Sequence, residues 1–221
     1  MAIELRKPPE ERTWHGQHRR SDPLRPPSAD PADLAPRLRR LVRSDAVESG
    51  FVQTLRLDLK PLPLAAYRLL LDGQRAEAEA LIGFALEGSR LSGLAPILRY
   101  RADQLDRDPS ELPWLVHLMV WREQWVVVGD IGFHAPPDDK GCVEIGYTVI
   151  EHYRRHGFAS EAALGLARWA GGQPGVKTLR ASISPQNTPS LRLAGRLGLV
   201  QVGSQIDEID GEELVFEGAI P

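Results

Sequence analysis

A short run of residues, Arg154–Ala159 (Arg-Arg-His-Gly-Phe-Ala), combines positive charge with small side chains between a predicted strand and a predicted helix. The first backbone N–H groups of a helix have no partner inside it, and the helix dipole places partial positive charge there. Gly157 has no Cβ, so the backbone can approach a ligand closely. A loop of this composition is suited to binding a diphosphate. Taken alone, the six residues also fit an ordinary turn flanked by two solvated arginines.

Other kinds of chemistry find less support. Cys142 is the single cysteine, so an internal disulfide is excluded, and no Cys or His stands at the spacing of a zinc site or an activated thiol. His152 and His156 are four residues apart, but the turn between strand and helix separates them. No Gly-Lys-Ser/Thr follows Gly157, and Gly-x-Gly-x-x-Gly is absent, so neither a Walker loop nor a dinucleotide fingerprint is present. No metal site is predicted.

The elements before the loop follow from the spacing of apolar residues. Gln53–Leu59 alternates apolar and polar residues, as a half-buried strand does. Two helices are predicted next, Leu62–Leu71 and Ala76–Leu86, with Gly73 as a stop between them. Short polar connections then join three strands into an antiparallel meander. These strands are Trp114–Trp121, Trp125–His134 and Cys142–Ile150.

After the loop, Phe158–Trp169 carries one apolar helical stripe and ends at the Gly171-Gly172 pair. Thr178–Ser184 alternates again, so strand, helix and strand form a βαβ unit. Its two strands should run parallel with a right-handed crossover.

The C-terminal part contains one more predicted helix and a hairpin. The helix begins with Thr188 as N-cap and ends at Gly198. The last two strands, about Leu199–Glu208 and Glu212–Glu217, meet at an Asp210-Gly211 turn.

Composition indicates one domain. The chain has 221 residues, 26% charged and 42% hydrophobic, which suffices for one good core. A formal charge of −3 gives no reason to expect a nucleic-acid or membrane partner for the whole molecule. No apolar run approaches the roughly 20 residues that span a bilayer, and no apolar signal core begins the chain. A cytoplasmic protein is the expectation.

The N-terminal region differs from the rest. Residues 1–43 hold seven of the eighteen prolines and ten Lys/Arg against six Asp/Glu, which leaves a net −7 from residue 44 onward. Ser21–Pro36 has almost no large apolar residues, so burial cannot offset its ordering entropy. Residues 1–50 are therefore predicted to be an extended or disordered tail, and 51–221 one domain. A basic arm that contacts RNA or a partner is the alternative reading of the tail.

The pattern of Arg154, Gly157 and Ala159 is similar to the Gln/Arg-x-x-Gly-x-Gly/Ala signature of the GNAT superfamily of acetyltransferases. The resemblance covers about Gln53–Glu217 and looks closest to the branch with ribosomal-protein N-terminal acetyltransferases. Further similar features occur in the same order: the meander, Glu144–Tyr147 (Glu-Ile-Gly-Tyr), the βαβ unit, Asn187–Ser190 (Asn-Thr-Pro-Ser), Leu197–Leu199 and the closing hairpin.

This resemblance implies a mixed α/β fold, with a mostly antiparallel twisted sheet, one parallel crossover at a splayed V and helices on both faces. It implies acetyl-CoA as co-substrate, with pantetheine in the V and the pyrophosphate on the loop. The cofactor-binding residues implied are the backbone of Tyr147, Thr148 and Val149, the N–H groups of Arg155, His156, Gly157, Phe158 and Ala159, the charge of Arg154, and Asn187 near the pantetheine arm or the sulfur.

For catalysis, the resemblance implies Glu144 as the base that takes a proton from the acceptor amine, directly or through a water. His117 and His134 on neighbouring strands are alternatives. Many family members use a tyrosine on the helix after the Asn as the acid, but Ala194 stands about there. Ser190 is the expected substitute, with a backbone-bonding helix serine as the other reading.

Three functions therefore remain open. The first is transfer of an acetyl group to a primary amine of a small molecule or a protein N-terminus. The second is a GNAT-fold module that binds acyl-CoA without catalysis, as a sensor or scaffold. The third uses the basic arm on nucleic acid, with steep salt dependence. The acidic body favours a cationic acceptor. Trp114, Trp121 and Trp125 line an acceptor pocket or belong to the core, and a homodimer is in keeping with GNAT relatives.

Overall fold

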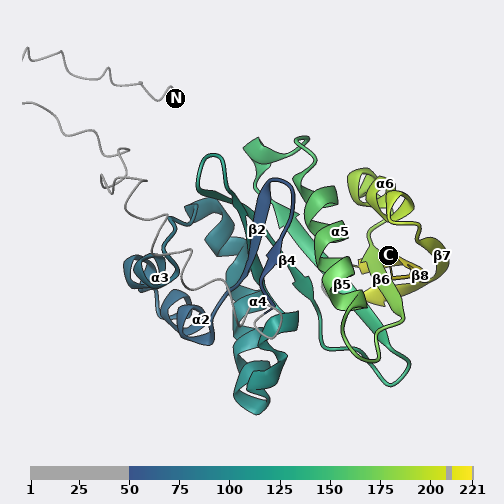
Figure 1. Ribbon diagram of the computed structural model, residues 1–221, viewed down its shortest axis with the longest axis horizontal. Helices are drawn as coiled ribbons and strands as arrows, with labels where there is room; N and C mark the ends of the chain where they lie inside the picture. Colours follow the sequence, from purple (N-terminus) through teal and green to yellow (C-terminus); the bar gives the residue numbers. More distant parts are fainter. Residues whose placement is uncertain (1–49, 208–210, 221) are drawn as a thin grey trace, which may run out of the picture. The chain divides into compact units, whose positions relative to one another are not determined.

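The computed structural model describes residues 50–207 and 211–220, with the backbone alone for residues 88–93. Within them, eight strands form one sheet in the order β1-β2-β3-β4-β5-β6-β8-β7, with helices on both faces (Figure 1). Each neighbouring pair is antiparallel except β5 and β6, which are parallel. The predicted mixed fold with one parallel crossover is confirmed. The strands are β1 (Val52–Gln53), β2 (Leu57–Pro61), β3 (His117–Trp121), β4 (Val126–Phe133), β5 (Cys142–Val149), β6 (Thr178–Ile183), β7 (Val200–Asp207) and β8 (Gly211–Ala219).

The helices lie mostly where the sequence predicts them. The two before the meander are confirmed in shortened form, because the first begins after Pro63 and the second ends at Gly83 in the left-handed conformation. The helix after the loop is confirmed and ends at the glycine pair. The helical segments are α2 (Leu64–Leu71), α3 (Arg75–Ile82), α4 (Gly88–Arg107), the 3-10 turns η1 (Pro109–Trp114) and η2 (Glu151–Tyr153), α5 (Phe158–Gly171) and α6 (Thr188–Arg196).

Helix α4 has no counterpart among the predicted elements. Two glycines and Pro96 fall within its 20 residues, and both residue types normally argue against a helix interior. Its buried stripe, which includes Leu94, Leu98 and Leu105, packs on the sheet, and this burial offsets the low helix propensity of the glycines and Pro96. The predicted strand Trp114–Trp121 is likewise shortened, because Pro113 and Trp114 belong to η1.

Side chains that alternate along the strands form two cores. On one face, Met119, Val143 and Ile145 pack with the buried stripe of α5 and with Leu193 of α6. On the other face, Leu118 belongs to the cluster that α2 and α4 cover. Strands β3 and β4 thus contribute to both cores, whereas the buried residues of β5 belong to the core that α5 covers.

The predicted strand Gln53–Leu59 is wrong, since this stretch is a hairpin. β1 pairs with β2 through Val52 opposite Leu59 and Gln53 opposite Asp58. Leu55 lies at the turn and is 86% exposed although the alternation predicts a buried position. The turn is held by long-range contacts that a local pattern does not encode, as described below.

Two predictions concern residues outside the described ranges. The tail of residues 1–50 is described only at Gly50, and Asp210 of the last turn is not described, so both remain predictions. The helices that the structure describes include none long and apolar enough to cross a membrane.

Candidate functional site

A gap opens in the middle of the sheet, between β5 and β6. The two strands pair only at their beginnings, from Cys142 opposite Thr178 to Glu144 opposite Arg180. Beyond these pairs β5 continues beside β4 to Val149, whereas β6 continues beside β8. Among the described residues, no strand pairs with the second half of β5 on the β6 side. The structure therefore has the splayed V that the resemblance implies.

The backbone of β5 presents alternate residues to this gap. The N–H of His134 donates to the Glu144 carbonyl at 2.8 Å, and the N–H of Ile150 donates to the Val128 carbonyl at 2.9 Å. Because bonding direction alternates along an antiparallel ladder, Thr148 also turns its backbone toward β4. Tyr147 and Val149 turn theirs toward the gap. Of the three predicted strand residues, Thr148 alone directs its backbone away from the gap.

The loop Arg154–Ala159 follows β5 and η2 and leads into α5. No described residue accepts a hydrogen bond from the backbone N–H groups of residues 155–159, whereas the Gly157 carbonyl already accepts from the N–H of Glu161 at 3.1 Å. The side chain of Arg154 donates to the Val149 carbonyl at 3.1 Å and so ties the loop to the end of β5. Five such donors at the N-terminus of a 14-residue helix are suited to binding an anion.

The loop has an unusual backbone conformation. Arg155 has φ 65° and Gly157 has φ 81°, both in the left-handed region. A non-glycine residue there is under strain of about 1 kcal/mol or more, which persists where the surrounding structure enforces it. The imidazole Nδ1 of His156 lies 2.9 Å from the carbonyl oxygen of Arg154, and this contact helps to hold the loop in its conformation. Such strained turns of successive N–H groups bind anions.

Opposite the end of β5, helix α6 brings Ser190 to the gap. The hydroxyl of Tyr147 donates to Oγ of Ser190 at 3.0 Å. Burial raises the pKa of Tyr147, and the bond to Ser190 offsets only part of that rise, so the phenol stays protonated at neutral pH. Asn187, not Thr188 as predicted, is the N-cap of α6, because its Oδ1 accepts from the Ser190 N–H at 3.2 Å. The predicted site residues Tyr147, Asn187 and Ser190 thus form one cluster.

Glu144 belongs to a second polar cluster, on the face opposite α5. Its Oε1 accepts from Oγ of Ser182 at 2.5 Å and lies 3.9 Å from Nδ1 of His134. The amide of Gln205 continues the network, donating to Ser182 Oγ at 3.2 Å and to Glu213 at 3.0 Å. The parallel register of β5 and β6 brings Glu144 and Ser182 together. The carboxylate is therefore oriented and partly accessible, as a base must be.

The two alternative bases have different surroundings. His117 is fully buried, and its two ring nitrogens lie 2.8 Å from the backbone carbonyls of Leu115 and Gly50. These contacts indicate a structural role. The side chain of His134 is 55% exposed. Burial lowers the pKa of His134 more than the nearby Glu144 raises it. His134 is therefore neutral at physiological pH and remains beside the predicted base.

Other candidate residues fall outside the site. Burial raises the pKa of Cys142, which disfavours the thiolate. In the described ranges, no three His, Cys, Asp or Glu side chains are grouped as metal ligands. Trp114 and Trp121 pack against the core, whereas Trp125 is 39% exposed and lies 5.3 Å from the ring of Phe84.

Sequence reasoning missed three residues around the site: Arg56, Glu161 and Ser182. Arg56 and Glu161 lie 105 residues apart and meet only through the β1–β2 turn. Ser182 was assigned to the correct strand, and the predicted parallel pairing with β5 was the signal that could have placed it beside Glu144. No local motif indicates the other two.

Comparison with known proteins supports one family. The model of the acetyltransferase (GNAT) domain matches residues 24–200. The uncharacterized N-acetyltransferase YjdG of Bacillus subtilis (strain 168) is 31% identical over 83 residues, which is 38% of this chain and 49% of that protein. The chain thus spans about half the length of the curated relatives it matches.

Solved structures share the fold at low sequence identity. The microcin C7 self-immunity acetyltransferase MccE, solved in complex with acetyl-CoA and AMP, is 15% identical with a TM-score of 0.53, over 75% of this chain and 93% of that one. The ribosomal-protein-S5-alanine acetyltransferase of Vibrio fischeri is 12% identical with a TM-score of 0.53, over 77% and 96%. Together with the splayed sheet and its loop, the match of the family model over most of the chain shows that this protein belongs to the GNAT family of acetyltransferases.

Proposed function

We propose that the protein is an N-acetyltransferase that transfers the acetyl group of acetyl-CoA to a primary amine of a small molecule or a protein N-terminus, by direct attack in a ternary complex. One observation carries this proposal. The gap between β5 and β6 ends at a helix N-terminus where five backbone N–H groups have no acceptor among the described residues. A ligand with an extended arm that contains amide groups and leads to a diphosphate matches both parts. CoA has this construction.

The residues present fit such a ligand. The backbone of Tyr147 and Val149 would bind the amides of the pantetheine arm, because both residues face the gap. The N–H groups of Arg155, His156, Gly157, Phe158 and Ala159 would hold the diphosphate, with Arg154 adding positive charge. Gly157 contributes the positive φ that the loop requires. Asn187 would hold the first turn of α6 beside the sulfur. A bound acetyl-CoA supplies a thioester as the acyl donor.

Glu144 would take the proton of the attacking amine. Ser182 fixes its carboxylate, and Nδ1 of His134 lies 3.9 Å away, so a bridging water would be needed to relay the proton. A positioned base near neutral pH contributes about 10²–10⁴-fold. A backbone N–H at the gap would stabilise the negative charge that develops on the carbonyl oxygen. The acidic body, with net −7 from residue 44 onward, supports a cationic acceptor.

Ser190 would give a proton to the departing sulfur. Ala194 is buried and has no proton to give, so α6 offers its first-turn serine instead. Tyr147, protonated and hydrogen-bonded to Ser190, can restore that proton. The lack of a tyrosine on α6 also favours the second candidate, a module that binds acyl-CoA without turnover. The two candidates predict different results in a CoA-release assay. The enzyme releases CoA from acetyl-CoA when an acceptor amine is supplied, whereas the binding module does not.

The deciding experiment is isothermal titration with acetyl-CoA and with CoA. Wild-type protein is compared with the double variant Arg154→Ala/Gly157→Asp, which places negative charge in the diphosphate site. The matched control is Arg68→Ala/Gly73→Asp, since Gly73 also has positive φ and has open space around it. Binding that is lost in the first variant and kept in the control supports the cofactor site. A well-folded wild type that binds neither ligand would overturn the proposal.

A further inference from the structure

The side chain of Arg56 reaches from the β1–β2 turn to the loop Arg154–Ala159. Its Nη1 donates to the carbonyl of His156 at 3.0 Å. Its Nη2 lies 3.4 Å from the position that a Cβ on Gly157 would take. A guanidinium thus stands beside the glycine of the anion site, although it comes from a segment about 100 residues earlier. This contact is the basis of the inference.

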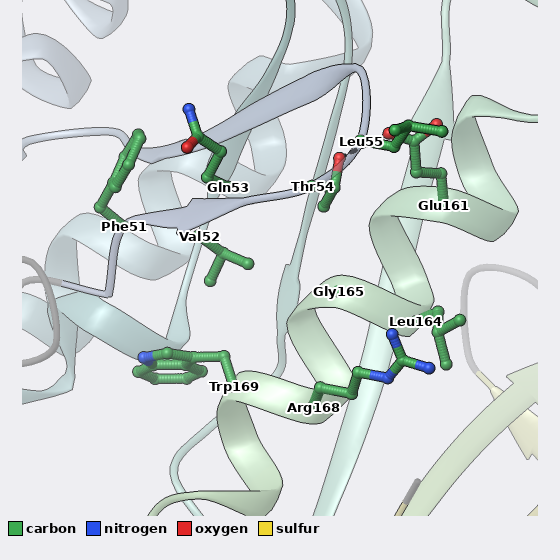
Figure 2. Close-up of a pocket in the computed structure, with 10 residues that line it drawn as sticks. All are labelled: Phe51, Val52, Gln53, Thr54, Leu55, Glu161, Leu164, Gly165, Arg168 and Trp169. Carbon is green, nitrogen blue, oxygen red and sulfur yellow. Dashed lines mark hydrogen bonds between the residues drawn. The ribbon is translucent and has the colours of Figure 1, made fainter.

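Glu161, in the first turns of α5, orients this guanidinium. Its Oε2 accepts from Nε of Arg56 at 2.7 Å, and its Oε1 accepts from the backbone N–H of Arg56 and from Thr54 Oγ1, each at 2.6 Å. Figure 2 shows Thr54 at the hairpin turn, facing Glu161 on the helix. The guanidinium also lies over the ring of Phe158, 4.7 Å from its centroid. Three contacts, with Glu161, the His156 carbonyl and the Phe158 ring, therefore fix its position.

The turn that carries Arg56 is itself held in place. Arg122, just after β3, donates to the carbonyls of Thr54 and Leu57 at 2.7 Å each, to the carbonyl of Leu55, and to Asp58 at 2.9 Å. One cation thus satisfies three carbonyl groups of the hairpin. A lone two-stranded hairpin is marginally stable. Arg122 and Glu161 together make this one a rigid support.

The guanidinium keeps an unused edge. Nε and Nη1 have partners, whereas none of the described residues accepts a hydrogen bond from Nη2, and the side chain is 39% exposed. The planar donors of arginine match phosphate oxygens in geometry. We propose that Arg56 binds a phosphate group of CoA through this edge and so extends the anion site formed by the loop backbone. The inference rests on the proposed function.

The test compares three ligands that differ in their phosphates: CoA, 3′-dephospho-CoA and pantetheine. Each is titrated into wild type, Arg56→Met and Arg56→Lys, with Arg68→Met as the matched arginine control because Arg68 pairs with Asp106 on α2 and α4. We expect Arg56→Met to weaken CoA about tenfold and to leave pantetheine unchanged. Arg56→Lys keeps the positive charge but lacks the planar pair of donors, so it should lose less affinity for CoA than Arg56→Met. Added salt should weaken wild-type binding more steeply than Arg56→Met binding.

The ligand pattern locates the contact. If Arg56→Met loses affinity equally for CoA and dephospho-CoA, Arg56 contacts the diphosphate. If it loses affinity for CoA alone, Arg56 contacts the 3′-phosphate. Wild-type affinity in folded Arg56→Met would overturn the inference, as would an equal loss for pantetheine, which would mean that the variant distorts the gap. Should Arg56→Met unfold, the three ligands are compared with Arg56→Lys instead: weaker binding of CoA with pantetheine unchanged supports the inference, and wild-type affinity for CoA overturns it. Failure of wild type to bind any CoA would overturn the proposed function itself and is thereby distinguished.

Discussion

The hydroxyl of Tyr147 and the Oγ of Ser190 are 3.0 Å apart and join β5 to the first turn of α6. The two residues come from opposite sides of the gap, so their hydroxyls meet where the sulfur of a bound CoA is expected. Under the proposed function, Tyr147 of β5 would take the place of the tyrosine that α6 lacks.

Removal of the Tyr147 hydroxyl should slow turnover without weakening cofactor binding. We expect Tyr147→Phe to lower kcat about tenfold and Ser190→Ala at least as much, since loss of a general acid costs on the order of 10²-fold or more. Because the residues act as a unit, the double variant should cost little more than Ser190→Ala. Steady-state kinetics with an amine found by CoA release would measure this, with Tyr153→Phe as control. Full kcat in Tyr147→Phe would exclude its hydroxyl from proton transfer, and full kcat in Ser190→Ala would exclude Ser190 as the acid.

Loss of the Glu144 carboxylate should remove the base. Glu144→Gln keeps the size and an acceptor for Ser182, so the fold and the affinity for acetyl-CoA should be retained while kcat falls about 100-fold. Glu212→Gln, at an exposed position of β8, is the control. A greater loss in His134→Gln than in Glu144→Gln would transfer the role to the imidazole, which lies 3.9 Å away.

Acid should weaken the contact between the hairpin and α5. Partial burial raises the pKa of Glu161, but the hydrogen bonds from Thr54 and Arg56 together lower it by a larger amount. The pKa therefore lies below its usual 4.5. A depressed carboxyl pKa stabilises the fold above the unfolded pKa, and this stability is lost as pH falls through the folded pKa. Urea unfolding of wild type and Glu161→Gln should therefore differ at pH 7 and converge toward pH 3. A difference that does not change with pH would refute this account.

His117 should matter for stability and not for catalysis. His117→Ala would leave a cavity and remove the partner of the Gly50 and Leu115 carbonyls, at a cost of about 3 kcal/mol in the free energy of unfolding. His134→Ala, at a half-exposed position, should cost under about 1 kcal/mol. Thermal and urea denaturation would measure both. Equal costs would show that the buried hydrogen bonds contribute little.

The sequence predicted the parts of the fold that depend on local order. The meander, the crossover helix and the glycine-containing loop each have their own pattern, and these patterns are consecutive along the chain. These patterns placed the candidate site residues, which were named from the resemblance to the GNAT family, on β5, the loop and α6. Their positions follow from the topology, because a parallel pair with a right-handed crossover brings the loop and α6 to the same end of the sheet.

The sequence could not predict contacts made between distant segments. The alternation of Gln53–Leu59 continues through the hairpin turn without a glycine or proline to mark it. What bends the chain there is Arg122 and Glu161, which lie 64 to 107 residues away. In the same way, the N-cap of α6 was placed one residue late, because Asn187 and Thr188 are both good caps and only the geometry distinguishes them.

The gap beside β5 also affects the tendency of the protein to aggregate. Beyond Glu144 the strand presents an unpaired edge in the interior of the sheet, and such edges elsewhere recruit an extra strand from another chain. A ligand whose amides pair with Tyr147 and Val149 takes the place of that strand. Preparations saturated with CoA should therefore resist aggregation on storage and heating, in addition to any gain in melting temperature from mass action.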